Sequence, residues 1–532
     1  MHARIMSKVL ITTSGVGERL GKHTKHTNKS LVKVGDKYAI CHIIETYSTD
    51  VVFVVTLGHY GDYVKDFLDM AYPDRIFEYV RIDNYQGPGS SLGYSLLQAR
   101  PNLQCPFIFH CCDAIVTEQI GFTPGTNTLY VAKVDTNSQY SSIISGADRV
   151  VLEINDKGCQ AFDYAYAGIS HIHDFYAFWD KLHTIYLQNP GNMGLSDVHA
   201  IKQMALDGFL FEYNVLSQWY DTGNLTSYYA LKSIKSMFDS KYTVLEKDNE
   251  SLCFVGDKVI KFINDKDVNA KRVARGKLLR PHSPEIIHHS ANFLKMALVT
   301  GTVMSEVRTH GNIIKLLEWA AAHFWINADV SEKHVESCKR FYFEKTRNRL
   351  KDLPMLEDPQ NERMMINGLR CRSVIDIINS IPEEVLCTDV FYQYHGDFVL
   401  DNIIYSSSGE FVLIDWRHEF DGNLTHGDVY YDLAKLRHNL ILNHKNVNAG
   451  LYDLEYIDSD SATVDLKCNY FHVAQLQQYD VFVESRGFNL HKIRILTALI
   501  WLNMAPLYDG KFSEFLFYFG KYNLTMSLEN GP

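Results

Sequence analysis

Short apolar runs alternate with amphipathic stretches along the first half of the chain. Four runs have the composition of buried strands, at residues 9–11, 51–55, 77–82 and 106–110. Residues 63–70, between the second and third runs, have the spacing of a helix. Strands that alternate with helices predict a doubly wound, Rossmann-like, mostly parallel α/β sheet. Ligands bind such sheets at the carboxyl ends of the strands.

The pattern changes after residue 242. Residues 253–263 predict a β-hairpin with Gly256 and Asp257 at its turn. Helical spacing follows at residues 272–279 and 312–324. A chain of 532 residues is too long for one hydrophobic core, so at least two domains are expected.

Composition narrows the function classes. Hydrophobic residues make up 46% of the chain and charged residues 22%, as in globular proteins. A net charge of −11 does not predict a nucleic-acid-binding surface. The chain shows no run of 18 apolar residues and no signal peptide, so we expect no membrane insertion and a cytoplasmic location. Its 10 scattered cysteines predict reduced thiols rather than a zinc site or disulfide framework.

The first candidate site is the turn that follows residues 9–11. Ser14, Gly15 and Gly17 form a small-residue turn whose backbone N–H groups can reach an anion. Arg19 and Lys29, farther along, can neutralise a triphosphate and its leaving group. An ordinary glycine turn is the alternative interpretation.

A longer sequence pattern makes the functional interpretation of this turn more specific. GVGERL at residues 15–20 and NKSL at residues 28–31 resemble the Gly-x-Gly-Thr-Arg-Leu and Pro-Lys-x-Leu segments of sugar-1-phosphate nucleotidyltransferases. The resemblance covers about residues 7–235 and implies that Arg19 and Lys29 are catalytic. Glu18 and Asn28 depart from the family pattern, where threonine and proline stand.

Two aspartates are candidate magnesium ligands. Asp113 follows the fourth apolar run, where an aspartate can bind a metal or cap a helix. Asp221 lies in QWYDTGN at residues 218–224, which resembles the family's Trp-x-Asp-x-Gly-Thr segment. The resemblance implies that Asp113 and Asp221 together hold one Mg²⁺ ion on the α-phosphate.

The same resemblance implies contacts to the nucleotide base and to the acceptor. Gly89 and Ser90 match the base-contacting turn, although a plain loop is the alternative. Gly168 lies in the sugar-side strand at residues 164–169, and Lys157 is the candidate for the family's acceptor lysine.

The second half contains HGDFVLDN at residues 395–402 and IDW at residues 414–416. These motifs resemble the aminoglycoside phosphotransferase and choline kinase group, which implies a bilobal, α+β, protein-kinase-like fold. Asp397 would accept the proton of an attacking hydroxyl, while Asn402 and Asp415 would bind Mg²⁺.

Three further features of the second half have two interpretations each. Lys261 is either a surface lysine or the lysine that pairs the α- and β-phosphates of ATP. We interpret Asp428 and Asp432 as structural braces of the catalytic loop. Tyr508 and Phe512 belong to an aromatic tail that either packs as core or cages a quaternary amine.

These observations predict a bifunctional enzyme with a nucleotidyltransferase domain at 7–238 and kinase-like lobes at 239–308 and 309–528. ATP phosphorylates a small sugar or polyol, and an NMP from CTP, UTP, GTP or dTTP is then transferred to the phosphate, with Mg²⁺ at both sites. The product is a nucleotide-linked precursor for surface (capsule) polysaccharide. The alternatives are an amino-alcohol (choline) kinase with a CTP:phosphocholine-type cytidylyltransferase, or one domain that only binds nucleotide as a regulatory module. A homo-oligomer is compatible with the sequence.

Overall fold

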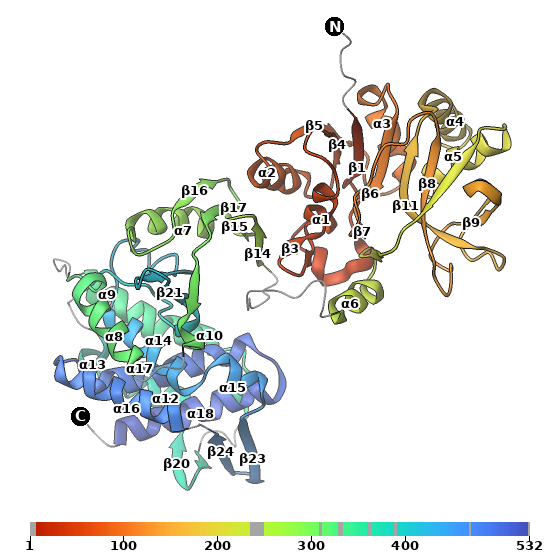
Figure 1. Cartoon of the computed structure of the whole chain (residues 1–532). Coiled ribbons are helices and arrows are strands. Elements are labelled where there is room, and N and C mark those ends of the chain that lie inside the picture. Colours follow the sequence, from red (N-terminus) through yellow and green to blue (C-terminus); the bar gives the residue numbers. More distant parts are fainter. Residues whose placement is uncertain are drawn as a thin grey trace. The chain divides into compact units, whose positions relative to one another are not determined.

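The computed structural model describes residues 7–234, 249–307, 311–327, 333–358, 363–387, 391–467 and 470–529. The chain divides into two compact units (Figure 1). Unit 1 is Met1–Lys266 with Ile287–Met296, and unit 2 is Asp267–Ile286 with Ala297–Pro532. The predicted domain boundaries at 238/239 and 308/309 lie outside the described residues.

Unit 1 is an α/β structure. Its strands are β1 (Lys8–Thr12), β2 (Lys33–Val34), β3 (Lys37–Tyr38), β4 (Val52–Leu57), β5 (Ile76–Arg81), β6 (Phe107–Cys111), β7 (Ala114–Val116), β8 (Asn127–Ala132), β9 (Ser142–Ser145), β10 (Val151–Asn155), β11 (Tyr164–Ile172), β12 (Phe211–Val215), β13 (Trp219–Asp221), β14 (Glu250–Val255) and β15 (Lys258–Ile263). Its helices are η1 (Glu18–Thr24), η2 (Lys29–Leu31), α1 (Ala39–Glu45), α2 (Gly61–Ala71), α3 (Leu92–Ala99), η3 (Arg100–Asn102), η4 (Ala147–Arg149), α4 (Phe175–Gln188), α5 (Asp197–Leu206) and α6 (Leu225–Ser233).

One 9-stranded sheet organises unit 1. Seven of its strands follow the order β10-β9-β11-β6-β1-β4-β5, and β8 pairs with both β11 and β12. β5, β4, β1 and β6 are mutually parallel, whereas β11 runs antiparallel to β6. The doubly wound, mostly parallel sheet predicted from the alternating apolar runs is confirmed. The parallel strands end at one edge, which is where their connecting turns place polar side chains.

Helices cover both faces of the sheet (Figure 1). Val9 and Ile11 belong to a core shared with α1 and α2, while Leu10 belongs to a second core shared with α3, α4 and α5. Successive strand residues point to opposite faces, so a fully apolar strand serves both cores. All three side chains are 0% exposed, which explains why the run shows no polar alternation.

The hairpin of β14 and β15 packs within unit 1. Cys253, Ile260 and Phe293 join the same core as Tyr38. The Tyr38 hydroxyl lies 2.7 Å from Ser251 Oγ, and backbone atoms also bond across this junction. β14 and β15 form a sheet of order β14-β15-β17-β16 with β16 (Ile286–His289) and β17 (Phe293–Ala297). The stretch predicted as one lobe, 239–308, is therefore divided between the two units.

Unit 2 combines helices with two small sheets. Its helices are α7 (Lys266–Leu278), η5 (Met304–Glu306), α8 (Asn312–Trp319), the π-helical turn η6 (Ala320–Phe324), α9 (Lys333–Lys339), the π-helical turn η7 (Arg340–Glu344), α10 (Lys345–Leu350), α11 (Pro354–Glu357), α12 (Val374–Asn379), α13 (Glu383–Leu386), η9 (Leu400–Asn402), α14 (Val429–Ile441), α15 (His444–Asn448), α16 (Tyr470–Ser485), α17 (Leu490–Met504), η10 (Ala505–Leu507) and α18 (Gly510–Glu529). Its strands are β18 (Gly301–Val303), β19 (Arg363–Ile366), β20 (Leu369–Arg372), β21 (Ile403–Ser406), β22 (Phe411–Leu413), β23 (Tyr452–Asp458) and β24 (Ser461–Leu466).

α14, α17 and α18 form the helical core of unit 2. An ion pair of 2.8 Å joins Lys492 of α17 to Asp428 at the start of α14, with side chains only 1% and 0% exposed. Phe512 of α18 lies 4.8 Å from Tyr508, between ring centroids, and is buried. This packing supports a core role for the aromatic tail. Among the helices of the described ranges, none combines the length and the apolar character needed to cross a membrane.

Substitution of Gly276 by alanine tests the packing of α7. An added Cβ would lie 2.3 Å from Trp416 Cζ2 and 2.6 Å from Ile286 Cδ1. Helix propensity alone favours alanine by about 1 kcal/mol, but overpacking costs about 1–3 kcal/mol. We expect Gly276→Ala to lower the midpoint of thermal unfolding, and the exposed Lys277→Ala in the same helix to leave it nearly unchanged. A higher midpoint for Gly276→Ala would contradict this packing.

Candidate functional site

The turn after β1 leaves room for a ligand above its backbone. A Cβ added at Gly15 would meet no atom within 4 Å, whereas one at Gly17 would lie 3.0 Å from Lys29 Cβ. Ser14 Oγ lies 2.9 Å from Ser95 Oγ of α3, and this hydrogen bond connects the turn to α3. Gly17 has φ 73°, a conformation that glycine adopts at little cost. The turn therefore exposes backbone N–H groups beside Lys29.

Asn28 fixes the position of Lys29. The Asn28 amide donates hydrogen bonds to Thr13 O at 2.8 Å and His59 O at 2.6 Å. Its Oδ1 accepts a bond from Ser30 N at 2.9 Å and so caps η2, the short helix that begins with Lys29. Asn28 is thus a structural link between the glycine turn and this lysine.

The structure brings Asp113 and Asp221 together. β13 pairs with β7 in a register that places Asp221 opposite Ala114, the residue after Asp113. A Cβ added at Gly223 would lie 2.7 Å from Asp113 Oδ2, 2.9 Å from Asp221 Oδ1 and 3.4 Å from an Arg19 Nη atom. Two carboxylates and a guanidinium therefore converge on one glycine. Each comes from a different segment of the chain.

Charge balance differs between the two aspartates. Lys29 Nζ lies 3.1 Å from Asp113 Oδ2. Burial alone would raise the pKa of Asp113, but the Lys29 ammonium outweighs it and lowers the pKa to about 2. For Asp221, burial and then the negative charge of Asp113 raise the pKa. The Asp221 carboxylate accepts hydrogen bonds from Tyr140 Oη at 3.0 Å and Gly223 N at 2.7 Å.

The pair has the donor chemistry that Mg²⁺ requires. Mg²⁺ is commonly bound by one or two protein carboxylates, with phosphate oxygens and water completing the shell. The missing side chain at Gly223 keeps the space between Asp113 and Asp221 free. The described part of the chain contains no group of three or more His, Cys, Asp or Glu side chains that could hold a metal alone. The pair therefore fits a metal that a bound phosphate helps to hold.

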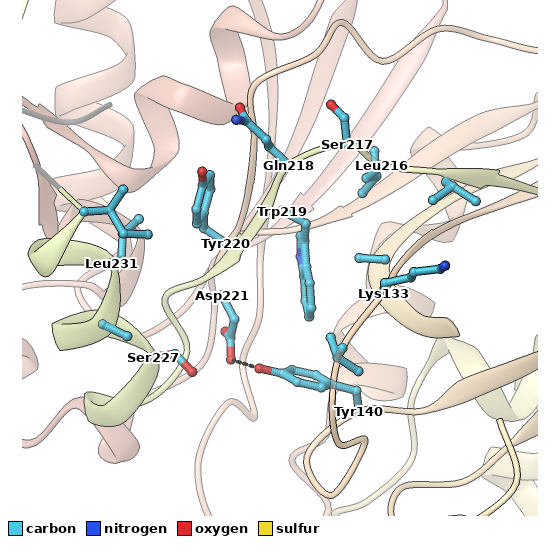
Figure 2. Close-up of a pocket in the computed structure, with 15 residues that line it drawn as sticks. Lys133, Tyr140, Leu216, Ser217, Gln218, Trp219, Tyr220, Asp221, Ser227 and Leu231 are labelled. Carbon is cyan, nitrogen blue, oxygen red and sulfur yellow. Dashed lines mark hydrogen bonds between the residues drawn. The ribbon is translucent and has the colours of Figure 1, made fainter. Parts of the chain in front are cut away.

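A pocket of about 580 Å³ lies beside Asp221 (Figure 2). Figure 2 shows the rings of Trp219 and Tyr140 at its edge, with the Tyr140 hydroxyl bonded to Asp221. The two ring centroids are 4.9 Å apart in an edge-on arrangement. Trp219 Nε1 is buried and has no hydrogen-bond partner among the described residues. The wall thus offers an aromatic surface to a small molecule.

Gly89 and Ser90 were predicted to contact the nucleotide base, and Gly168 and Lys157 the acceptor. Ser90 donates to Gly87 O at 2.6 Å, and Gly89 has φ 83° in the same turn. A Cβ added at Gly168 would lie 3.0 Å from Cys111 Cβ, so Gly168 packs directly on Cys111. Lys157 is exposed after β10 and does not line the pocket beside Asp221. The structure therefore places Gly168 against Cys111, two residues before Asp113. Lys157 lies apart from the pocket.

The second candidate site lies in unit 2. Asp397 Oδ1 forms a 2.7 Å ion pair with Lys435 Nζ of α14. Asn402 Nδ2 donates to Asp397 Oδ2 at 3.1 Å and to Asp397 O at 3.0 Å. Burial alone would raise the pKa of Asp397, but Lys435 outweighs it and lowers the pKa. Asp397 is therefore held ionised, as a proton acceptor must be.

Asp415 lies close to this pair. Ile414 N donates to Asn402 O at 2.9 Å, which fixes the segment before Asp415 beside Asn402. Asp415 has φ 52° and forms an ion pair with Arg272 of α7. All three residues of the predicted Asp-Asn-Asp set are thus brought together.

Asp432 braces the loop that precedes Asp397. Its carboxylate accepts hydrogen bonds from His395 N at 2.7 Å and Gly396 N at 2.6 Å. His395 in turn bonds Ile414 O at 2.9 Å, and burial lowers the pKa of His395 to about 4, so its ring is neutral. The structural role predicted for Asp432 is confirmed by these bonds. Asp428 instead caps α14 and pairs with Lys492.

Lys261 belongs to unit 1. Its Nζ lies 2.9 Å from Glu250 Oε2, on the neighbouring strand of the hairpin, and its side chain is only 8% exposed. The lysine is buried and paired, rather than a surface residue. Its role toward ATP stays a prediction.

Four residues with clear contacts were not assigned from the sequence: Tyr140, Gly223, Arg272 and Lys435. Lys435 follows Asp432 by three positions on α14, so the same helix face could have suggested it. No local pattern marks Tyr140 or Arg272, whereas Gly223 is the glycine of the QWYDTGN motif at residues 218–224. Their roles arise from contacts between distant segments.

Comparison with protein-family models and with curated protein sequences gives no match. Solved nucleotidyltransferases match over the N-terminal part. CTP:phosphocholine cytidylyltransferase from Streptococcus pneumoniae is 20% identical, covering 43% of this chain and 99% of its own, with TM-score 0.37. Inositol-1-phosphate CTP transferase from T. maritima is 15% identical, covering 44% and 97%, with TM-score 0.34. A UDP-glucose pyrophosphorylase bound to UDP-glucose is 17% identical, covering 43% and 98%, with TM-score 0.36. Such distant likeness does not establish an activity.

Substitution of Gly223 by alanine tests the convergence of the two aspartates. The added methyl group would occupy the space between Asp113 and Asp221, so metal affinity should fall by at least about tenfold. Mn²⁺ binding in the presence of an NTP, measured by electron paramagnetic resonance, checks this. The matched control is Gly121→Ala, because an added Cβ there meets nothing within 4 Å. Equal Mn²⁺ affinity in both variants would contradict a metal site at this glycine.

Proposed function

We propose that the chain is a bifunctional enzyme that phosphorylates a small hydroxylated compound and then couples the phosphate to a nucleoside monophosphate. The observation that supports the second step best is the convergence of Asp113, Asp221 and Arg19 on Gly223. The first step is supported by the placement of Asp397, Asn402 and Asp415 in unit 2. The product would be an activated, nucleotide-linked precursor for surface polysaccharide.

Nucleotidyl transfer would take place at the carboxyl edge of the unit 1 sheet. An oxygen of the acceptor phosphate attacks the α-phosphorus of the NTP, and the bond from that phosphorus to the β-phosphate oxygen breaks. Pyrophosphate leaves with the electron pair. When bound by Asp113 and Asp221, Mg²⁺ would neutralise charge on the α-phosphate. Arg19 and Lys29 bind the leaving group, and the glycine turn supplies backbone N–H groups.

Phosphoryl transfer would take place in unit 2. The acceptor hydroxyl attacks the γ-phosphorus of ATP, its proton passes to Asp397, and the bond to the β–γ bridging oxygen breaks to release ADP. Asn402 and Asp415 would hold Mg²⁺ on the phosphates. Asp432 and His395 keep the loop rigid, so that Asp397 is oriented before the acceptor arrives.

Two substitutions should separate the activities. Asp221→Asn should lower pyrophosphate release by at least about a hundredfold, because it removes a charged metal ligand, and leave ADP formation intact. Asp397→Asn should do the reverse, because it removes the proton acceptor. Pyrophosphate is measured with each of four NTPs and a panel of sugar, polyol and amino-alcohol phosphates. ADP is measured with the parent alcohols.

Other outcomes identify the alternatives. Loss of both activities in either variant would contradict two independent sites. NTP binding without turnover, unchanged by Asp113→Ala, would favour a regulatory binding module in unit 1. Turnover with phosphocholine and choline alone would favour the amino-alcohol enzyme.

A further inference from the structure

Four basic side chains gather beside the proposed proton acceptor of unit 2. They are Lys345 and Arg349 of α10, Arg417 after β22, and Lys435 of α14; we term them the cation cluster. Lys345 Nζ lies 3.9 Å from the centroid of the Phe341 ring, and the Arg417 guanidinium carbon lies 4.9 Å from the same centroid. Both cations therefore contact one aromatic ring.

The cation cluster borders the loop that contains Asp397. Lys435 Nζ lies 2.7 Å from Asp397 Oδ1. Arg417 N donates to His395 O at 3.0 Å. A Cβ added at Gly396 would lie 2.5 Å from Arg417 Cβ. A molecule that places a hydroxyl at Asp397 would thus have Lys435 and Arg417 next to it, with Lys345 on the same Phe341 ring as Arg417.

Three members of the cluster lack an acidic partner. Lys435 pairs with Asp397, but Lys345, Arg349 and Arg417 form no ion pair with a carboxylate among the residues that the structure describes. Arg349 contacts only a backbone oxygen, Asn503 O at 3.3 Å, and Arg417 contacts Glu419 O at 3.0 Å. Arg349 and Arg417 therefore keep a positive charge that no carboxylate among the described residues pairs with in the absence of a ligand.

The cations repel one another. Burial, followed by the charges of Arg417, Arg349 and Lys435, lowers the pKa of Lys345 to about 6. Lys345 is therefore largely neutral near pH 7 without a ligand, and an anion that enters the cluster would favour its protonated form. Arg349 is exposed, so solvent screens part of its charge from the other members of the cluster.

A shortage of acidic residues in the chain does not explain the excess of positive charge in the cation cluster. The chain has 63 acidic and 52 basic residues. Elsewhere in unit 2, Lys339 pairs with Glu383 at 2.8 Å, Arg340 with Asp421 at 2.7 Å and Lys271 with Glu419 at 2.6 Å. These three basic side chains have carboxylate partners, which Lys345 and Arg417 do not have among the described residues.

We propose that the compound phosphorylated in unit 2 is an anion: a small hydroxy acid whose carboxylate or phosphate group is bound by Lys345, Arg349 and Arg417 while its hydroxyl faces Asp397. The inference rests on the proposed kinase function and defines its substrate class. Guanidinium groups bind carboxylates and phosphates through two hydrogen bonds at once, and the lysine adds a point charge. A cationic amino-alcohol is disfavoured at this site because the cluster repels it.

The transfer itself is unchanged by the charge of the acceptor. The hydroxyl oxygen of the acid bonds to the γ-phosphorus of ATP as the bond to the bridging oxygen breaks. The hydroxyl proton passes to Asp397, and ADP leaves. The carboxylate or phosphate group of the acid takes no part in bond making and only holds the molecule in place.

The test compares matched acids and neutral alcohols on the full chain: glycerate with glycerol, gluconate with glucitol, and glycerol 3-phosphate and choline as further probes. Binding is measured by isothermal titration calorimetry and ADP formation with ATP and Mg²⁺. We expect an acid to bind at least tenfold more tightly than its neutral partner, with affinity falling as salt rises. Glycerate against glycerol 3-phosphate distinguishes a carboxylate site from a phosphate site. Preference for neutral alcohols or choline, or no acid binding, would overturn the proposal.

Two variants locate the binding. Lys345→Met and Arg349→Gln should each weaken acid binding at least tenfold and raise the KM of the acid, with the KM of ATP unchanged. The matched control is Arg347→Gln, because Arg347 lies on the same helix and bonds to Asn379 Oδ1 at 2.8 Å instead. An equal effect in Arg347→Gln, or a raised KM for ATP, would overturn the proposal, since the cluster would then bind the nucleotide or act only through folding.

Stability and turnover separate the remaining interpretations. Lys345→Met keeps a side chain on Phe341 and removes a polar amine from a partly buried site, so its thermal midpoint should equal or exceed that of the wild type. A lower midpoint would indicate a structural role and contradict the proposal. Acid binding that depends on the cluster, with no ADP formed from any probe, would support the anion site and overturn the kinase function on which its substrate assignment rests.

Discussion

The repulsion between two half-buried carboxylates is the constraint around which the proposed site of unit 1 is arranged. Asp113 and Asp221 approach each other across Gly223, and only Asp113 has a lysine partner. Burial and the charge of its neighbour raise the pKa of Asp221, so the pair is incomplete without a cation. Such strain is common where a protein binds a metal or a reacting phosphate. The parallel sheet serves this purpose because its strand ends bring distant segments to one edge.

In unit 2, the excess charge around the proposed site has the opposite sign. A single carboxylate, Asp397, is kept ionised by Lys435, and the loop before it is held by Asp432. Around this centre the excess is positive, since Lys345, Arg349 and Arg417 have no carboxylate partners among the described residues. The charge around each proposed site thus complements what it would bind, a metal in unit 1 and an anion in unit 2.

The hairpin of β14 and β15 shows that packing, rather than the local sequence pattern, decides which unit a segment joins. Its pattern predicted the start of a second domain, yet Cys253 and Ile260 complete the core that contains Tyr38. Apolar hairpin faces bury against whichever surface is complementary, and a two-stranded hairpin is marginally stable alone. Lys261 is thereby held beside Glu250 within unit 1.

The sequence by itself determined the four parallel strands β1, β4, β5 and β6, the doubly wound sheet and the motif residues, because apolar runs and glycine turns are local properties of the chain. It also grouped Asp397, Asn402 and Asp415, because the HGDFVLDN and IDW motifs resemble one pattern. Only the tertiary structure showed that Gly223 separates Asp113 from Asp221, that Lys435 neutralises Asp397, and that Lys157 lies apart from the pocket beside Asp221. Contacts between distant segments depend on how whole elements pack, and charge balance depends on those contacts. Neither is encoded in any single stretch of residues.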